Sequence, residues 1–316
     1  MSKYKSKKIA ALYNQNMLTG WAGEELAKSQ WDLLKAEPSF KEFPKFKSTA
    51  SRRMMLHEVV RKYLGKDTNN YPQEIGDCVS FGAKNAVEYL MCCERLLLRD
   101  NEKFRPVFPP YLYGTGRIYI GGGQLGNGDG SLGVWMADAI VKYGVLCSDE
   151  EGVPAYKGSV ASAWGGTRGK PYLDKWKPTA EIHPVKSAAK IDSWDEFVSA
   201  ICNGYPCTVA SMQGFEMEAG SDGFHDPRGE WAHQMCWIGV DDEHRDPYAL
   251  LLNSWGDAHG RLKDFNTGED LPVGVLRVRK RVVESMIRAG ETFAFSNFVG
   301  FPDQQEKLNK ELFKLI

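Results

Sequence analysis

The sequence lacks the features that mark two common classes of protein. Its 316 residues carry a formal net charge of −1, so there is no positive excess to attract nucleic acid or an anionic membrane surface. No run of eighteen apolar residues is present, and no apolar signal-peptide core follows the basic N-terminus. We therefore expect no nucleic-acid partner, no membrane partner and a cytoplasmic location.

The spacing patterns of metal sites and serine hydrolases are also missing. There is no C-x-x-C pair, the histidines have no cysteine or carboxylate partners at zinc-ligand spacing, and no G-x-S-x-G motif occurs. The seven cysteines include the adjacent Cys92 and Cys93, which suits a reducing compartment better than a disulfide framework. We expect neither a metal nor a cofactor. His225 and His259 lack the strand context expected of a catalytic base.

A glycine-rich segment from Arg117 to Gly133 imitates a nucleotide-binding motif. Gly121, Gly123 and Gly126 follow a plausible strand at the spacing of the dinucleotide fingerprint. No helix begins at the third glycine, because NGDG intervenes, and repeated β-α units are absent. A Rossmann fold is therefore the weaker interpretation of this segment.

The stretch from Tyr71 to Leu97 is the most informative part of the sequence. Asp77 is a suitable N-cap, which would make Cys78 the first residue of an amphipathic helix. Free N–H groups and the positive end of the helix dipole favour a thiolate at this position. Gly82, one turn later, would let a neighbouring element approach closely. A buried structural cysteine is the simpler interpretation unless partners for Cys78 exist.

Two apolar runs supply such partners. Residues 232–242 and 248–256 flank a polar, turn-forming segment, which predicts an antiparallel hairpin. If His233 lies directly opposite Asn253, the turn centres on Glu243 and both side chains share one face of the sheet. Cys78, His233 and Asn253 then provide a nucleophile, a base and a group that orients the base.

The blocks QEIGDCVSFGA, WAHQMCWIGVDD and LLLNSWG, in this order, resemble the papain-like cysteine peptidases. His233 follows Cys78 by 155 residues and Asn253 by 175, against roughly 130–150 in the family, so an insertion is expected. We place it in residues 148–187, anchored by Trp164 and Trp176. The resemblance covers residues 71–278 and implies an α+β, two-lobed papain-like fold, with a helical lobe, an antiparallel barrel-like sheet lobe and a cleft between them.

The resemblance also implies roles for individual residues. Cys78, as a thiolate paired with the His233 imidazolium, would attack a peptide carbonyl while Asn253 holds the imidazole ring. Gln73 would donate to the oxyanion with the Cys78 N–H, although it lies five residues before the nucleophile and the family glutamine lies six before. Trp255 would shield the Asn253–His233 bond at the substrate cleft.

The glycine-rich segment acquires a role in the same comparison. Asp129, Gly130 and Ser131 would bind an extended protein or peptide substrate through main-chain hydrogen bonds.

Three regions are expected along the chain. Residues 1–70, with helices over 21–36 and 52–64, would form a helical arm that is structural or docks on a partner, the alternative being a removable inhibitory pro-segment. Residues 71–301 would form the peptidase domain, and residues 302–316 a helical tail. Helices over 134–143 and 192–203 and strands over 206–212, 273–278 and 292–301 complete the expected elements.

Two other functions remain open at this point. One is a structural or interaction protein of a larger assembly, for example a viral particle, which keeps the papain-like fold with or without activity. The other is a related acyl transferase or deubiquitinase-like hydrolase, because the same three residue types serve several acyl transfers.

Overall fold

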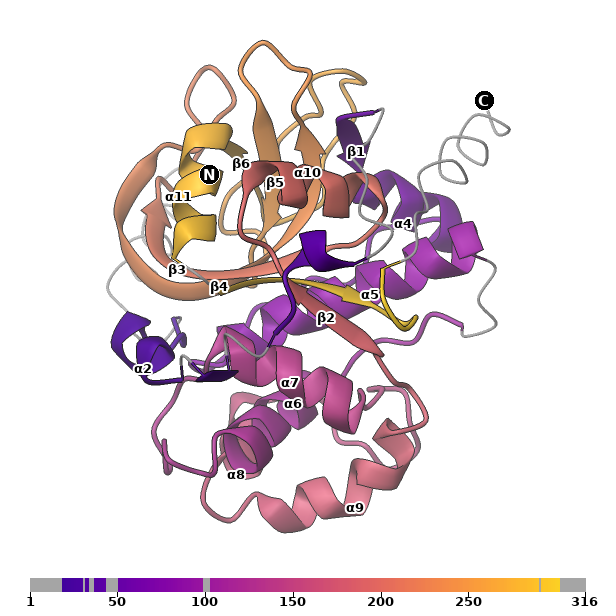
Figure 1. Ribbon diagram of the computed structural model, residues 1–316, viewed down its shortest axis with the longest axis vertical. Coiled ribbons are helices and arrows are strands. Elements are labelled where there is room, and N and C mark those ends of the chain that lie inside the picture. Colours follow the sequence, from indigo (N-terminus) through magenta and orange to yellow (C-terminus); the bar gives the residue numbers. More distant parts are fainter. Residues whose placement is uncertain are drawn as a thin grey trace, which may run out of the picture.

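The structure is a computed structural model that describes residues 19–30, 32–33, 37–43, 51–98, 103–289 and 291–301. A sheet lobe and a helical lobe lie one above the other, and α5 (Cys78–Leu98) runs along their boundary (Figure 1). The α+β, two-lobed architecture expected from the sequence is confirmed. The expected C-terminal helix over 304–316 and the first 18 residues lie outside the described residues.

Helix α5 begins at Cys78, as the sequence predicted. Its first turn closes on the main chain of Asp77, whose carbonyl accepts the N–H groups of Ser80 and Phe81. The predicted cap by the Asp77 carboxylate is wrong, because that carboxylate instead accepts the hydroxyl of Tyr156 at 3.0 Å. Helix residues between Cys78 and Cys93 are buried on all sides, so α5 is a core helix covered by both lobes.

The helical lobe packs around α5. Its remaining elements are α6 (Pro109–Thr115), η3 (Gly116–Ile120), α7 (Gly133–Tyr143), α8 (Gly158–Gly165) and α9 (Lys170–Ala180). Helix α7 ends at Gly144, whose φ of 65° suits glycine, as expected. Residues 148–187, where the sequence predicted an insertion, contain α8 and α9, which lie at the bottom of Figure 1 and include the buried Trp164 and Trp176.

The strand expected before the glycine-rich segment is a π-helix, η3, instead. The reason is Arg117, which is buried and whose guanidinium donates to the carbonyls of Gly128, Gly130 and Gly165, among others. These bonds fold the glycine-rich loop around one cation. An extended strand would carry that cation away from its acceptors.

The described strands form one antiparallel sheet in the order β2-β7-β3-β4-β5-β6, with β1 pairing with β4. Their bounds are β1 (Arg53–Met55), β2 (Ser187–Lys190), β3 (Cys207–Phe215), β4 (Pro227–Asp241), β5 (Tyr248–Leu252), β6 (Val275–Arg279) and β7 (Glu291–Ser296). Strands β5 and β7 are buried at every position; α5 and α7 contact β7, and α11 contacts both strands.

The predicted register of the hairpin is wrong, although the hairpin itself exists. Leu252 pairs with Cys236, and a bulge between Trp237 and Gly239 shifts the register by one residue. His233 therefore has no directly opposed partner in β5, and Asn253 lies just beyond the strand. Both residues nevertheless stay on the same face, because the offset from the predicted register is even at this end of the hairpin.

Four further helices complete the described fold. They are α2 (Glu24–Ser29), α4 (Leu56–Leu64), α10 (Trp194–Cys202) and α11 (Lys280–Arg288). Helix α10, expected over 192–203, begins at Trp194, and its N-cap Ser193 accepts the N–H of Glu196. Helix α11 was not predicted, although four apolar residues bury one of its faces against the sheet.

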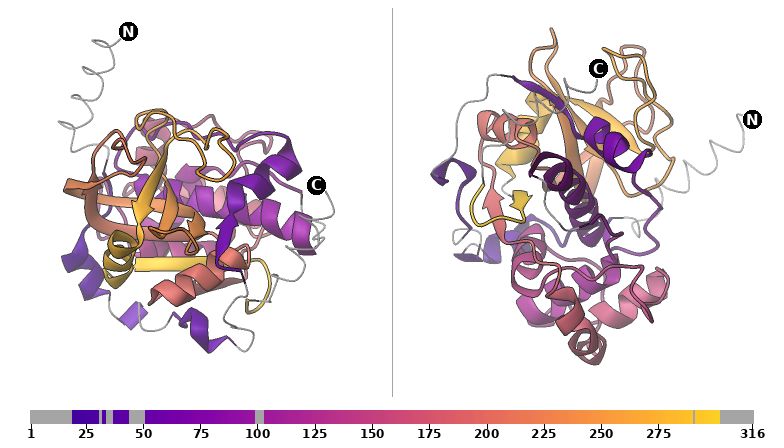
Figure 2. Two further views of the ribbon diagram at one scale, coloured as in Figure 1. Left: turned by 90° about the horizontal axis from the view of Figure 1, so that it is seen from above. Right: turned by 90° about the vertical axis from the view of Figure 1, so that its right-hand side faces the viewer.

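In the N-terminal region, residues 52–64 form β1 as well as α4, and the described part of the helix expected over 21–36 contains α2 and the helical residues 32–33. A short 3-10 helix, η2 (Phe40–Glu42), follows it. The side view in Figure 2 shows α4 beside α5 and the helical lobe below both. Among the described helices, none has the length and apolar character needed to cross a membrane.

Candidate active site

The first turn of α5 is clamped against strand β4. The backbone N–H of Gln234 points at the Cys78 sulfur at 3.4 Å, and its side-chain Nε2 donates to the Val79 carbonyl at 2.9 Å. A Cβ atom on Gly82 would lie 3.0 Å from the Gln234 side chain, tighter than ordinary packing. The close approach that the sequence predicted at Gly82 is confirmed, and it places the residue after His233 on the nucleophile candidate.

His233 and Asn253 meet through their side chains. His233 Nε2 lies 2.7 Å from Asn253 Oδ1, and the Ser254 backbone N–H donates to the same oxygen at 2.7 Å. The other ring nitrogen of His233, Nδ1, has no hydrogen-bond partner among the described residues. The Trp255 ring lies 4.8 Å from the His233 ring, centroid to centroid, and covers the pair. The arrangement leaves one nitrogen of a buried imidazole available for a proton.

Gln73 lies in the loop that precedes Cys78. Its Nε2 donates to the Ile75 carbonyl at 2.9 Å, and its Oε1 accepts the Ser254 hydroxyl at 2.6 Å. Its backbone N–H also donates to the Ser254 carbonyl. These bonds join the nucleophile loop to the segment after Asn253. The amide carries a second N–H, so donation to an oxyanion stays a prediction.

The three residues expected to bind substrate divide into two groups. The Asp129 carboxylate accepts the Gly76 N–H at 3.1 Å, and the Gly130 N–H donates to the Gly76 carbonyl at 3.1 Å, so both support the nucleophile loop. Ser131 has its main-chain N–H and C=O paired with the N-terminal arm.

Residues 19–22 of the arm cross the site. The N–H groups of Gly20 and Trp21 donate to the carbonyl of Ala232, the neighbour of His233, at 3.1 and 3.0 Å. Ser131 donates to the Gly20 carbonyl and accepts from Ala22, each at 2.8 Å. In Figure 1 this arm and α2 lie at the left, where the two lobes meet.

The fit of this arm leaves no room for a side chain at Gly20. A Cβ atom there would lie 2.0 Å from the Gly76 carbonyl oxygen, a distance that requires one backbone to move. Two glycines, one in the arm and one two residues before Cys78, therefore let the two backbones touch.

The side chain of Trp21 is buried and its indole N–H donates to the carboxylate of Glu291. Glu291 is itself fully buried and accepts the N–H of Val134 at 3.0 Å in the first turn of α7. The sequence predicted that Trp21 lies in a helix and that Glu291 directly precedes a strand. Neither position carries a pattern that would have revealed this pair, because the contact joins segments 270 residues apart.

Burial shifts the pKa of both catalytic candidates toward the neutral form. Loss of solvent raises the pKa of the Cys78 thiol to about 12, although the N–H of Gln234 opposes this shift. Burial also lowers the pKa of His233 to about 4, against the opposing bond to Asn253. At neutral pH both groups are uncharged. The thiolate–imidazolium pair expected from the sequence is therefore disfavoured in this conformation, because burial outweighs the backbone N–H groups of Gln234, Gly20 and Trp21, which favour the thiolate.

The sequence excluded His259 as a catalytic base, because this residue lacks the expected strand context. In the structure its side chain contacts Asn253 and belongs to this site. Its Nε2 lies 2.7 Å from Asn253 Nδ2. The chain reaches this position by turning at Gly256, whose φ is 58°. No periodicity marks such a turn-borne histidine, so the sequence offered only its spacing of six residues after Asn253.

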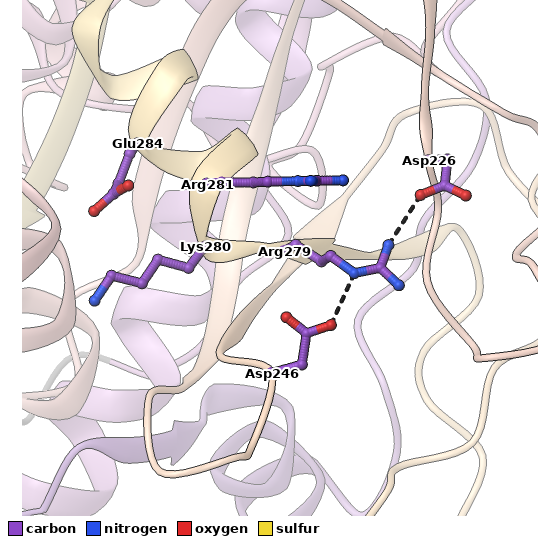
Figure 3. Close-up of a pocket in the computed structure, with 6 residues that line it drawn as sticks. All are labelled: Asp226, Asp246, Arg279, Lys280, Arg281 and Glu284. Atoms are coloured by element: carbon purple, nitrogen blue, oxygen red, sulfur yellow. Dashed lines mark hydrogen bonds and ion pairs between the residues drawn. The ribbon is translucent and has the colours of Figure 1, made fainter.

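Two surface pockets lie outside this group of residues. The one in Figure 3 is lined by acidic and basic side chains, and Arg279 is already paired there with Asp226 and Asp246. The other, of about 450 Å³, lies beside Trp21 and β3. No group of three metal-ligating side chains exists in the part of the chain that the structure describes.

The comparisons with known proteins support the fold. Three solved cysteine-protease structures are similar to this chain. The first is xylellain, a cysteine protease from Xylella fastidiosa, with a TM-score of 0.57 and 14% identity, covering 90% of this chain and 98% of that chain. The second is digestive procathepsin L 3 of Tenebrio molitor larval midgut, with a TM-score of 0.53 and 13% identity, covering 93% of this chain and 89% of that chain. The third is procathepsin B S9 from Trypanosoma congolense, with a TM-score of 0.51 and 10% identity, covering 91% of this chain and 87% of that chain. No protein-family model and no curated protein sequence matches this chain.

The class that this evidence defines is the papain-like fold of cysteine proteases. At these identities the similarity establishes the architecture, and the chemistry must be argued from the side chains.

We predict that the buried histidines stay neutral well below the usual pKa of histidine. Burial lowers the pKa of His57, His225 and His233 to about 4 and that of His259 to about 3. Because each pKa is lowered, the proton binds only as the pH falls through about 4. Imidazole resonances followed by NMR from pH 8 to pH 5.5 should not shift for these four residues. A titration near pH 6.5 at any of them would contradict the burial described here.

Proposed function

We propose that this protein is a cysteine peptidase that hydrolyses peptide bonds through Cys78, His233 and Asn253. The observation that carries the proposal is the bond of 2.7 Å between His233 and Asn253, which leaves His233 Nδ1 unpartnered next to the residue whose N–H points at the Cys78 sulfur. A thiol at a helix start, a base with a free nitrogen and a group that orients the base suffice for acyl transfer.

The chemistry proceeds in two halves. His233 Nδ1 takes the proton of the Cys78 thiol, and the thiolate attacks the substrate carbonyl. The resulting oxyanion accepts hydrogen bonds from the Cys78 backbone N–H and from the second side-chain N–H of Gln73. The C–N bond then breaks, the leaving amine takes the proton from His233, and a thioester remains on Cys78. Water, deprotonated by His233, hydrolyses the thioester, and the proton returns to the thiol.

The arm acts as an internal block in this proposal. The N–H groups of Gly20 and Trp21 donate to the carbonyl of Ala232, the residue before His233. The Gly20 carbonyl and the Ala22 N–H pair with the main-chain N–H and carbonyl of Ser131. A peptide substrate would need the same groups, because an extended backbone binds a cleft through its N–H and C=O groups. Of the two roles expected for residues 1–70, this geometry supports inhibition more than docking. Displacing the arm also returns water to Cys78 and His233 and so favours their charged forms.

A structural protein that keeps the fold remains the second candidate. The observation that favours it is that the candidate nucleophile and base are both neutral and sealed. An acyl transferase would use the same side chains with a different acceptor in place of water. Substrate cleavage separates these candidates.

We predict that Gly20→Ala displaces the arm. A Cβ atom that meets the Gly76 carbonyl oxygen at 2.0 Å forces the two backbones apart, so Cys78 should become accessible and alkylate faster. The measurement is mass spectrometry after a brief iodoacetamide pulse at pH 6. Gly128→Ala is the matched control, because its Cβ would meet nothing closer than the Leu125 carbonyl oxygen at 3.4 Å. Equal labelling of Cys78 in both variants and the wild type would argue against an arm that blocks the site.

We predict that three substitutions abolish or weaken cleavage without unfolding the chain. In the Gly20→Ala background, Cys78→Ser and His233→Ala should remove cleavage of a peptide library, and Asn253→Ala should lower it less. The reason is that Asn253 only orients the His233 ring, whereas Cys78 forms the covalent bond to the substrate and His233 transfers the protons. The melting temperature of each variant, measured alongside, controls for folding.

The outcome also decides between the candidates. A parent protein that cuts no peptide and transfers no acyl group, with all three variants melting normally, would favour the structural protein.

A further inference from the structure

His259 has both ring nitrogens engaged, and it is buried. Nδ1 lies 3.3 Å from the carbonyl oxygen of Met217, and Nε2 lies 2.7 Å from Nδ2 of Asn253. The ring is only 2% exposed and stacks on Trp255 at 5.8 Å with an interplanar angle of 22°. No contact joins it to Cys78 among the interactions described; it reaches the His233 ring through its hydrogen bond to Asn253 and through its stacking on Trp255.

The partners of His259 determine where its proton sits. A carbonyl oxygen can only accept, so the bond to Met217 requires an N–H on Nδ1. Burial lowers the pKa of His259 to about 3, so the neutral ring has no second N–H and its Nε2 is an acceptor. The group facing Nε2 must therefore donate, and in Asn253 only the NH2 group can do so.

An independent contact gives the same orientation of the Asn253 amide. The Ser254 backbone N–H can only donate, and it lies 2.7 Å from Asn253 Oδ1. The oxygen is therefore on the side of Ser254 and His233, and the NH2 group is on the side of His259. Because Oδ1 only accepts, His233 must carry its proton on Nε2, which leaves the lone pair on Nδ1.

We propose that His259 is a positioning residue that fixes the Asn253 amide and, through it, the tautomer of His233. The Met217 carbonyl, His259, Asn253 and His233 form one chain of directed hydrogen bonds, each of which fixes the next. Its far end is a main-chain carbonyl, and its near end is the nitrogen that the proposed function uses as a base. The catalytic half of the inference rests on that proposed function; the tautomer half does not.

Two variants test whether the hydrogen-bond acceptor at position 259 is what positions Asn253. His259→Phe keeps a ring on Trp255 but removes the acceptor for Asn253 Nδ2, which leaves a buried N–H unpaired or lets the amide turn over. His259→Gln can return an acceptor oxygen. His225→Phe is the control for loss of a buried histidine nearby, because His225 lies 5.8 Å from His259 but has no bond to Asn253 among those described.

The first readout is the tautomer, and it needs no activity. Nitrogen-15 NMR of the wild type should show His233 with its proton on Nε2 and His259 with its proton on Nδ1. In His259→Phe, His233 should become a mixture of tautomers, whereas His225→Phe should leave it unchanged. A pure Nε2–H tautomer of His233 in His259→Phe would overturn the proposal.

The second readout is catalysis in the Gly20→Ala background. His259→Phe should lower kcat by about 10-fold to 100-fold with KM little changed, since a misdirected base affects the chemical step and not binding. His259→Gln should recover most of that loss, and His225→Phe should show none. Equal kcat values for His259→Phe and its parent would reject the positioning role. A parent without activity would instead reject the proposed function and leave the NMR result to decide the inference.

Discussion

The structure depends on the contact between β4 and the first turn of α5. It exists because Gly82 has no side chain, so Gln234 can lie against the helix and direct its backbone N–H at the Cys78 sulfur. A Cβ atom at position 82 would lie 3.0 Å from the Gln234 side chain and 3.2 Å from the Met235 carbonyl oxygen, so a larger residue would push β4 away from the helix at this point. One missing side chain thus brings together residues that are 155 positions apart.

Burial in this closed cleft has opposite consequences for structure and chemistry. The Trp21 side chain and the backbone of Gly20 exclude water, which strengthens every directed hydrogen bond around His233 and Asn253. Burial also raises the pKa of Cys78 and lowers that of His233, which disfavours the charged pair in this conformation. In the proposed function, the hydrogen bonds of the site are already formed, and the charged pair forms when the arm leaves.

Local patterns in the sequence predicted the parts of the fold that depend on local forces. The end of α7 at Gly144 and the hairpin of β4 and β5 follow from glycine and alternation, and the start of α5 at Cys78 was predicted correctly although the carboxylate cap behind that prediction does not form. The register of that hairpin did not follow, because the bulge after Trp237 is set by packing.

The contacts of Trp21 and His259 were beyond sequence reasoning for a related reason. Trp21 lies on an irregular segment and His259 follows a turn, and each meets a partner that no period or spacing indicates. The site was therefore predictable where residue types recur in a known order, at Cys78, His233 and Asn253. It was not predictable where a single tertiary contact decides the outcome.

The central claim is that Cys78 is a nucleophile activated by His233 once the arm is displaced. The most direct test is to treat the Gly20→Ala protein with a peptide-based electrophile that mimics an acyl substrate and to locate the adduct by mass spectrometry. The account predicts one adduct, on Cys78, which disappears in His233→Ala while that variant still melts cooperatively. An adduct on other cysteines, or equal labelling of Cys78 without His233, would contradict it.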